Sequence, residues 1–527
     1  MREDYGVIPG STKERKIIYR VVDSLKETLE QVDLVDIPVN FWSSDCSINV
    51  GSDVNRCILL PYSSPIYLKV TPEEILFGRP NEIFRVKVRD KAILIDYPTN
   101  LTELRWITFL LSLRGAKAVL LSPELEGTLK SDVVLGSIGY TNYPTVPLNI
   151  PVACVDRKTA RIVAEKGFEL EARSEITMKE SKIVVGHLNG SGELEAHLTS
   201  HHDVLVGEFE DTPSSVLLSV IRRLRETYLP LNLTVISYTA REIGDAEFTE
   251  YHYTWGERYL LRVMSSKGAL DKVVLSASVG PIHSSRDLKI VSHPVFSKYL
   301  STELNLSEDH SFLESHFYLQ RGIPSLTITS LPNTWMFHNS TSFHVVDKAN
   351  IEAQITSTIL QVLKSAEFVN DWISDLRKNV IKSIGEQSLE TRVETSKLIS
   401  LSANVSPIKV VKEVTKLSYS LIYAMCSNPL KTWVKSSLFS SISGRTAETL
   451  NEYVKNCLGE LVIGDSKRSN FFLLGRTTSD NRDRLLNLYL RSIIMDLKSS
   501  INTSIAGAKL LGVASGGIEE WLEDKPV

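Results

Sequence analysis

Five residues of types that bind metal ions lie at or near the ends of predicted strands in the middle of the chain. His201 and Asp203 are two residues apart in "SHHDV", and Asp211 follows in "GEFEDTPSS" just before a helical pattern. Glu242 lies in "AREIG" after the apolar run "TVISYT", and His338 lies in "WMFHNST". Imidazole and carboxylate ligands suit zinc, and two metals about 3.5–4 Å apart hydrolyse peptides by sharing one activated water. The set therefore predicts a metal-dependent hydrolytic site.

These residues need a sheet whose strands end together. Between residues 179 and 370, strand-like runs alternate with the amphipathic helical patterns "SSVLLSVIRRLRETY" and "ANIEAQITSTILQVLKSAEF"; the runs are "KIVVGHLN", "EAHLTSHHD", "NLTVISYT", "KVVLSASVG" and "PSLTITS". Such alternation implies an α/β fold with a mostly parallel sheet covered on both faces. Ligands bind such sheets beyond the carboxyl ends of the strands, so we expect the ligand-type residues at one edge.

The rest of the chain divides into three predicted parts. Apolar positions at helical spacing predict an amphipathic helix over residues 12–34, which belongs with the sheet, so residues 1–50 and 179–370 form one α/β domain. Short β-branched runs such as "KAILIDYP" and "AKAVLLS" predict an inserted α/β module at 51–178. Helical patterns dominate 371–527 and predict a C-terminal helical domain, whose extensive apolar stripes favour self-association into a homo-oligomer.

Composition limits the class of protein and of partner. The chain has 527 residues, 23% of them charged, with a formal net charge of -4, which argues against nucleic-acid binding. No apolar run reaches about 18 residues, so no membrane span is expected. The first residues lack a secretory signal, and we expect a cytoplasmic protein. Five cysteines without CxxC spacing favour free thiols, although Cys46 and Cys57 could pair across a loop.

The order of these motifs resembles the zinc aminopeptidase, glutamate carboxypeptidase and transferrin receptor superfamily. The shared features are H-x-D, an Asp before a helix, a strand followed by the charged pair Arg241-Glu242 and then a glycine, "EDHSFLESHFYLQRGIPSLTI", and a final His. "VIPGSTKERK" resembles the superfamily's opening helix. The segment from "VRDKAILIDYP" to "NIPVACVDRKTARIVAEKG" resembles its protease-associated insert. The resemblance implies a zinc-exopeptidase-like sandwich that carries a protease-associated domain and a helical C-terminal domain.

The resemblance also assigns roles residue by residue. It implies that His201 ligates one metal, oriented by Asp203, and that Asp211 bridges the two metals. It implies that Glu242 and His338 hold the other metal. Asp309 and His310, in "EDHSF", would lie under the site at the substrate; a helix-capping role is the alternative for these two.

Two positions depart from the superfamily pattern. Arg241 stands where the family has its general base, and Ala277, in "LSASVG", stands where the family has an acidic ligand. A guanidinium stays protonated in proteins, so Arg241 cannot accept a proton from metal-bound water. The predicted site is therefore degraded, and we expect fewer than two zinc ions per chain. The departures also predict that Arg241 replaces a metal as the cation and hydrogen-bonds Asp211 or Glu242 within about 2.7–3.2 Å.

Two functions are compatible with this pattern. One is a catalytically impaired homologue that uses the fold to bind a peptide or protein ligand or to assemble. The other is an active metallo-exopeptidase that hydrolyses N-terminal or small peptide substrates with one metal retained at Asp211, Glu242 and His338. Glu242 could also be no more than the salt-bridge partner of Arg241. The fold alone cannot choose between these functions.

Overall fold

The structure is a computed structural model of the chain. It describes residues 6–330 apart from gaps at 84–85, 99–100, 135–146, 248–252, 283–286, 297, 302–303 and 308–312, together with residues 348–384, 408, 411, 412 and 415.

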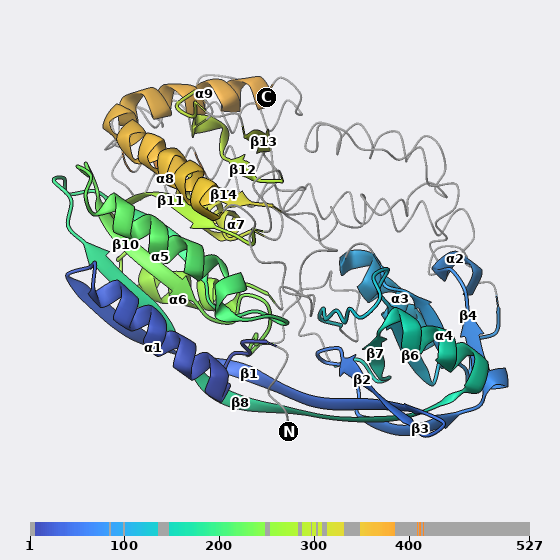
Figure 1. Ribbon diagram of the computed structural model, residues 1–527. Helices are drawn as coiled ribbons and strands as arrows, with labels where there is room; N and C mark the ends of the chain where they lie inside the picture. Colours follow the sequence, from blue (N-terminus) through green and yellow to red (C-terminus); the bar gives the residue numbers. More distant parts are fainter. Residues whose placement is uncertain are drawn as a thin grey trace.

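Two long antiparallel strands run the length of the molecule. These strands, β1 (Gln31–Val50) and β8 (Phe168–Leu188), pair continuously from Gln31 opposite His187 to Asn49 opposite Glu169. Figure 1 shows them along the lower edge, passing from the part that contains α1 and α5 to the part that contains α3 and α4. They therefore join two separately packed regions, here called the main region and the inserted region.

The main region is built on a mixed sheet. Its strands follow the order β13-β12-β14-β11-β9-β10-β8-β1. Their bounds, besides those given above, are β9 Glu195–His201, β10 Asn232–Tyr238, β11 Val273–Val279, β12 Lys289–Ser292, β13 Asn305–Ser307 and β14 Ser325–Thr329. The neighbours β10, β9, β11 and β14 are parallel, whereas β8 and β12 flank them in antiparallel orientation.

The predicted mostly parallel sheet is therefore correct for the centre of this region and for the edge pair β12 and β13, but not for β12 against β14 or for β8 against its neighbours. Alternation of strands and helices in the sequence indicates where crossover connections join parallel strands. It does not indicate the direction of the strands that flank them. The expectation failed at β8 because its partners, β1 and β10, are both antiparallel to it.

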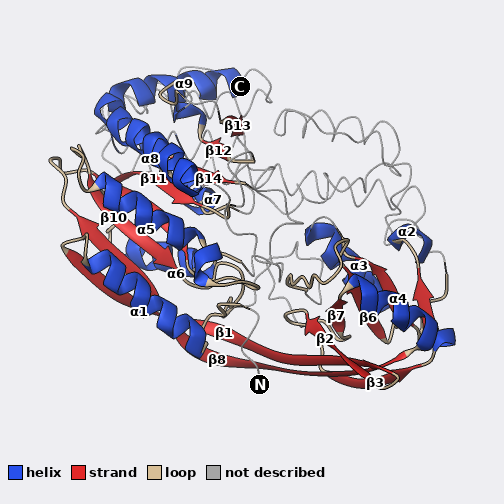
Figure 2. Ribbon diagram, in the orientation of Figure 1, coloured by secondary structure: helices blue, strands red, loops and turns tan. Residues whose placement is uncertain are grey.

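Helices cover both faces of this sheet, as Figure 2 shows. On one face the apolar sides of α1 (Thr12–Lys26), α5 (Pro213–Leu224) and α8 (Lys348–Ser365) pack with Leu198, Val235 and their neighbours in one large core. On the other face α6 (Trp255–Ser266) and α7 (Ser315–Gln320) cover alternate positions of the same strands, such as Ile236 and Tyr238. Alternate residues of a strand point to opposite faces, which explains this division.

The first helix begins where the sequence predicts and ends earlier than predicted. The Ser11 side chain accepts a hydrogen bond from the Glu14 N–H at 2.9 Å, and the Glu14 carboxylate accepts one from the Gly10 N–H at 2.6 Å. This reciprocal arrangement satisfies two N–H groups that have no partner within the helix. The helix ends at Lys26 and not near residue 34, because the alternating residues that follow Gln31 form β1.

The inserted region has its own sheet and core. Its strand order beyond β1 is β2-β7-β6-β5-β4. The bounds are β2 Asp53–Leu59, β4 Ile75–Phe77, β5 Ala92–Asp96, β6 Ala118–Ser122 and β7 Val152–Val155, with β3 (Ile66–Val70) paired to β8. The helices are α2 (Pro80–Ile83), α3 (Leu101–Leu113) and α4 (Arg157–Lys166). Its core also takes in Leu205, Val206 and Ile243, which belong to loops of the main region.

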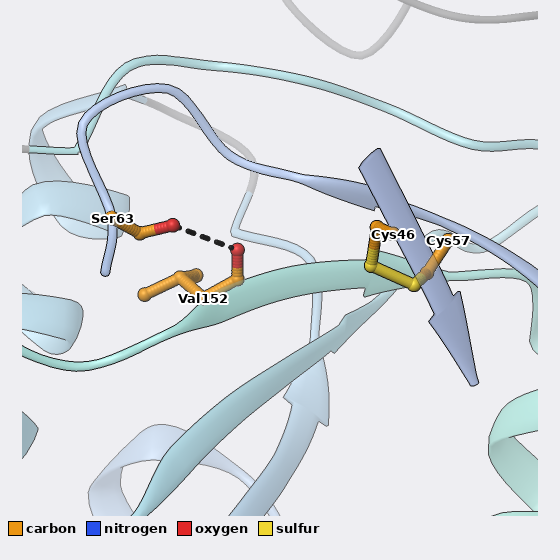
Figure 3. The surroundings of a disulfide bond; sticks show 4 residues. All are labelled: Cys46, Cys57, Ser63 and Val152. Atoms are coloured by element: carbon orange, nitrogen blue, oxygen red, sulfur yellow. Dashed lines mark hydrogen bonds between the residues drawn. A yellow bond between two sulfur atoms is a disulfide. The ribbon is translucent and has the colours of Figure 1, made fainter. Parts of the chain in front are cut away.

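A disulfide joins Cys46 and Cys57, so the prediction of free thiols at these two positions is wrong. Figure 3 shows the bond where β1 meets β2, near the contact between Ser63 and Val152. The pairing of β1 with β2 runs from Val50 opposite Asp53 to Ser47 opposite Arg56, which brings the next pair of residues face to face. Their Cα atoms are 5.3 Å apart, within the range that disulfides require.

The chain beyond residue 370 is described only in part. Helix α9 (Val369–Ile384) begins against the main core, where Trp372 contacts the ring of Phe296 edge-on at 5.2 Å. The remainder of the predicted C-terminal helical domain lies outside the described residues, except for four positions that include Val411 in the main core. In the part of the chain that is described, none of the helices is both long and apolar enough to cross a membrane.

Candidate functional site

The carboxyl ends of β9 and β10 lie side by side and carry the candidate site. His201 ends β9 and is in direct parallel register with Tyr238, which ends β10. Asp203 follows the first strand by two residues, and Arg241 and Glu242 follow the second within a short turn. All four side chains are buried, with Arg241 the most exposed at 7%. The sheet edge therefore collects these residues as the sequence leads one to expect.

Asp203 fixes the turn that carries Arg241 and Glu242. One carboxylate oxygen of Asp203 accepts a hydrogen bond from the Arg241 N–H at 3.1 Å, and the other accepts one from the Glu242 N–H at 2.8 Å. Its carboxylate lies 3.6 Å from Nδ1 of His201, while its backbone carbonyl lies 3.0 Å from the same nitrogen. The carbonyl, and not the carboxylate, is therefore the closer partner of His201.

The tautomer of His201 follows from that contact. A carbonyl oxygen can only accept, so Nδ1 carries the proton and a neutral ring keeps its lone pair on Nε2. This Nε2 atom is buried, has no hydrogen-bond partner among the described residues, and lies 3.9 Å from Oε1 of Glu242. His201 thus presents an acceptor atom towards a carboxylate, an arrangement that a cation or a proton between them stabilises.

Arg241 lies between two carboxylates. Its Nη1 is 3.0 Å from Oε1 of Glu242, and its Nε is 3.0 Å from Oε1 of Glu314, which is fully buried at the start of α7. Burial alone lowers the pKa of this guanidinium, but the charges of Glu242 and Glu314 outweigh burial and raise it. The expected contact with Glu242 is therefore present, and Glu314 is a second partner that sequence reasoning missed. Glu314 lies within "EDHSFLESHF", and the sequence pattern there does not distinguish it from a surface glutamate.

A further carboxyl group lies close by on α6. Glu257 is buried, and neither of its carboxyl oxygens has a hydrogen-bond partner among the described residues. Burial, with the charge of Glu314 as the next cause, raises the pKa of Glu257 well above its ordinary value. The raised pKa favours the neutral acid form of Glu257 beside the group of Asp203, Arg241, Glu242 and Glu314, here called the Arg241 cluster.

A second polar group lies behind the turn and is called the His202 network. The Glu14 carboxylate accepts hydrogen bonds from the hydroxyls of Ser181, at 2.7 Å, and Thr239, and its Oε1 lies 3.5 Å from Nε2 of His202. Nδ1 of His202 is 2.8 Å from the hydroxyl of Ser237, and short contacts continue from Ser237 to Ser214 and from Ser214 to Ser200. Every member is buried, so this network anchors α1 and α5 to the sheet.

Two described positions differ from the dinuclear zinc site that the sequence resemblance implies. The carboxylate of Glu242, one expected ligand, is already bound by the guanidinium of Arg241. Ala277, at another expected ligand position, lies in the main core opposite Leu198 and offers no donor atom. Among the residues that the structure describes, no group of three His, Cys, Asp or Glu side chains has the arrangement of a metal site.

Four predicted positions cannot be placed in this geometry. Asp211 ends a short 3-10 helix (η2, Phe209–Asp211) just before α5, but its side chain lies outside the described part of the structure. Asp309, His310 and His338 also lie outside the described residues.

Comparison with known proteins identifies the fold. No protein-family model matches the chain, and no curated protein matches its sequence. Among solved structures, a zinc aminopeptidase from Bacillus subtilis is 16% identical, with a TM-score of 0.51, and the match covers 68% of this chain and 90% of that chain. A peptidase M28 precursor from Shewanella amazonensis is 14% identical, with a TM-score of 0.52 and the same coverage. The chain therefore has the zinc aminopeptidase-like fold, that of the superfamily its sequence motifs resemble.

Proposed function

We propose that the protein is a peptidase-like homologue without zinc-peptidase catalysis, which uses the fold to bind a peptide or protein ligand. The observation that carries this proposal is the position of Arg241 between Glu242 and Glu314 at 3.0 Å from each. In this account the guanidinium takes the place of a metal ion as the cation of the site.

The chemistry of the guanidinium supports this account in two ways. A guanidinium holds its proton throughout the physiological range, so it cannot accept one from an attacking water. Its positive charge also opposes a divalent ion beside the same carboxylate, and that repulsion is poorly screened at a buried site. A carboxylate at the same position would accept a proton from the water and would attract a divalent ion.

The proposal also covers the inserted region, the C-terminal part of the chain and self-association. We assign residues 51–178 to a protease-associated-like insert and residues 371–527 to a helical domain that promotes self-association. Sedimentation of a chain that ends near Asn370 should show a smaller species than the full chain. An unchanged oligomer would remove the helical domain from the account.

Restoring the superfamily pattern tests the role of Arg241. Arg241→Glu removes the cation and adds a carboxylate, so the variant should be destabilised and zinc should partly rescue it. The double variant Arg241→Glu with Ala277→Asp should hold more zinc than the unmodified chain. Ala277→Asp alone is the control, because it adds a carboxylate and keeps the guanidinium. A panel of aminoacyl and acidic dipeptide substrates should show no zinc-dependent hydrolysis by the unmodified protein.

The second candidate is an exopeptidase with one retained metal. The observation in its favour is that the buried Nε2 of His201 has no hydrogen-bond partner among the described residues and lies 3.9 Å from Oε1 of Glu242, where His201 would join Glu242 beside a cation. The fold family supports zinc as the metal, with Asp211, Glu242 and His338 as the expected ligands. Hydrolysis of the peptide panel that is lost on chelation and restored by zinc would establish this function and contradict the first.

A further inference from the structure

The turn that carries Arg241 and Glu242 has an unfavourable backbone conformation. Ala240 has φ +54°, and Gly244 has φ +111°. A non-glycine residue rarely adopts the left-handed region, because its Cβ approaches the following carbonyl oxygen too closely. Such a conformation persists only where surrounding contacts impose it.

Part of the support for the turn comes from the main region itself. The carboxylate of Asp203 accepts the N–H groups of Arg241 and Glu242, as described above. At the start of α6, the Trp255 N–H donates to the Ala240 carbonyl at 2.8 Å and the Thr254 N–H donates to the Arg241 carbonyl at 2.7 Å. These contacts hold the first half of the turn.

The second half of the turn is held by Tyr62 of the inserted region and by Asn40 of β1, the strand that leads into that region. The Gly244 N–H donates to the hydroxyl of Tyr62 at 3.2 Å. The Asn40 N–H donates to the Gly244 carbonyl at 3.0 Å, and the Asn40 side chain donates to the Asp245 carbonyl at 2.7 Å. Between Glu242 and Gly244, the side chain of Ile243 is buried in the core of the inserted region.

Tyr62 is itself fixed by the inserted region. It is fully buried, its ring meets that of Trp42 edge-on at 5.9 Å, and its carbonyl accepts the Leu148 N–H at 2.7 Å. Burial raises the pKa of its phenol, so the group that meets Gly244 is a neutral hydroxyl. The disulfide between Cys46 and Cys57 ties β1, which contains Trp42, to β2, which leads to Tyr62.

We infer that the inserted region positions the Arg241–Glu242 turn through Tyr62 and through its core's contact with Ile243, and that Asn40 of the connecting strand β1 supports the same turn. The inference goes beyond the proposed function, because it holds whether the site binds a ligand or cleaves one. It follows that a protein partner that shifts the inserted region alters the geometry of Arg241 and Glu242 without touching either residue.

Hydrogen exchange of the full-length protein tests this inference with a matched pair of variants. Tyr62→Phe removes only the hydroxyl that meets Gly244. Tyr97→Phe removes a buried hydroxyl of the same region, which contacts Asp132 at 3.0 Å and does not touch the turn. Loss of one hydrogen bond should speed exchange of the 240–245 segment about five- to tenfold in Tyr62→Phe. Tyr97→Phe should leave that segment within about twofold of the unmodified protein.

The slow amides of β9 and β11 provide the internal reference for global stability. Equal acceleration of the turn by both variants, or acceleration of the reference strands by the same factor as the turn, would overturn the inference. If Tyr62→Phe does not fold, Ile243→Val gives the same test, because it trims the contact with the inserted core and leaves every hydrogen bond in place. Since the readout is local exchange, a negative result leaves the proposed role of Arg241 standing, and zinc found in the protein leaves this inference standing.

Discussion

Two buried polar groups lie at neighbouring strand ends and differ in how their charges are satisfied. In the His202 network, one carboxylate, that of Glu14, receives an N–H and two hydroxyl donors, and the contacts continue through serine hydroxyls. In the Arg241 cluster, the carboxylates of Glu242 and Glu314 share one guanidinium, and the carboxylate of Asp203 accepts the N–H groups of the turn beside it. Oε2 of Glu314 and, in the other network, Nε2 of His202 have no hydrogen-bond partner among the described residues. The first arrangement is typical of a structural anchor. The second retains an excess of negative charge that stability alone does not require.

The turn geometry adds to this difference. The strained Ala240 directly precedes Arg241, and contacts from two regions hold the turn that contains both residues. Strain of this kind collects at functional sites, where geometry matters more than free energy of folding. The comparison therefore favours the Arg241 cluster over the His202 network as the site of the proposed function.

The largest effect should come from removing the central cation. Arg241→Met keeps much of the side-chain volume and leaves Glu242 and Glu314 without their shared partner. Breaking a buried ion pair in this way costs about 3–5 kcal/mol, because the remaining charge is uncompensated. Denaturant unfolding of the variant and the unmodified protein measures the difference in free energy of unfolding.

A double variant separates this cause from a packing defect. Adding Glu314→Gln to Arg241→Met removes one of the two uncompensated charges, so the double variant should be more stable than the sum of the single effects predicts, by about 0.5–3 kcal/mol. Strict additivity would mean that Arg241 and Glu314 do not depend on one another, which contradicts the account.

A smaller effect is expected in the His202 network. Ser237→Ala removes the hydroxyl between His202 and Ser214 and leaves a buried imidazole nitrogen without that partner. The cost should be about 1–3 kcal/mol in the free energy of unfolding, with no change in metal content. A change in zinc binding by this variant would show that the two polar groups are not separate, and the comparison would fail.

The smallest effect, taken per pH unit, is the dependence of stability on pH. The pKa of Glu257 is raised in the folded protein, so the folded state binds more protons than the unfolded state above the ordinary glutamate range. The resulting stability is fully present below that range and falls as pH rises towards the folded pKa, by at most about 1.4 kcal/mol per pH unit. Glu257→Gln mimics the protonated acid and should flatten this part of the stability profile between about pH 5 and pH 8. Glu27→Gln on the surface is the control.

The sequence predicted the parts of the site that depend on strand ends. Parallel strands that end together place the residues that follow them at one edge of the sheet. This rule was enough to predict that four residues lie close together: His201, Asp203, Arg241 and Glu242. Glu314 and Tyr62 could not be found this way, since they reach the turn from α7 and from the inserted region, 73 and 182 residues away from their partners. Contacts between residues so far apart in the sequence produce no local sequence pattern.

The cysteines illustrate the same limit. The expectation of free thiols rested on the predicted compartment, a statistical argument that contains no geometry. Strand pairing places Cys46 opposite Cys57, and that pairing depends on the register of β1 against β2. The sequence predicted where the strands lie better than it predicted which strands pair and in which direction. The antiparallel pairs at the two sides of the main sheet show the same limit.

The metal content of the purified full-length protein tests the central claim most directly. Prepared without chelator and measured by elemental analysis, the unmodified chain should hold far fewer than two zinc ions, because the guanidinium of Arg241 occupies the carboxylates that a metal would need. Under the same conditions, Arg241→Glu with Ala277→Asp should gain zinc. Two zinc ions per unmodified chain would contradict the claim that Arg241 serves as the cation of this site.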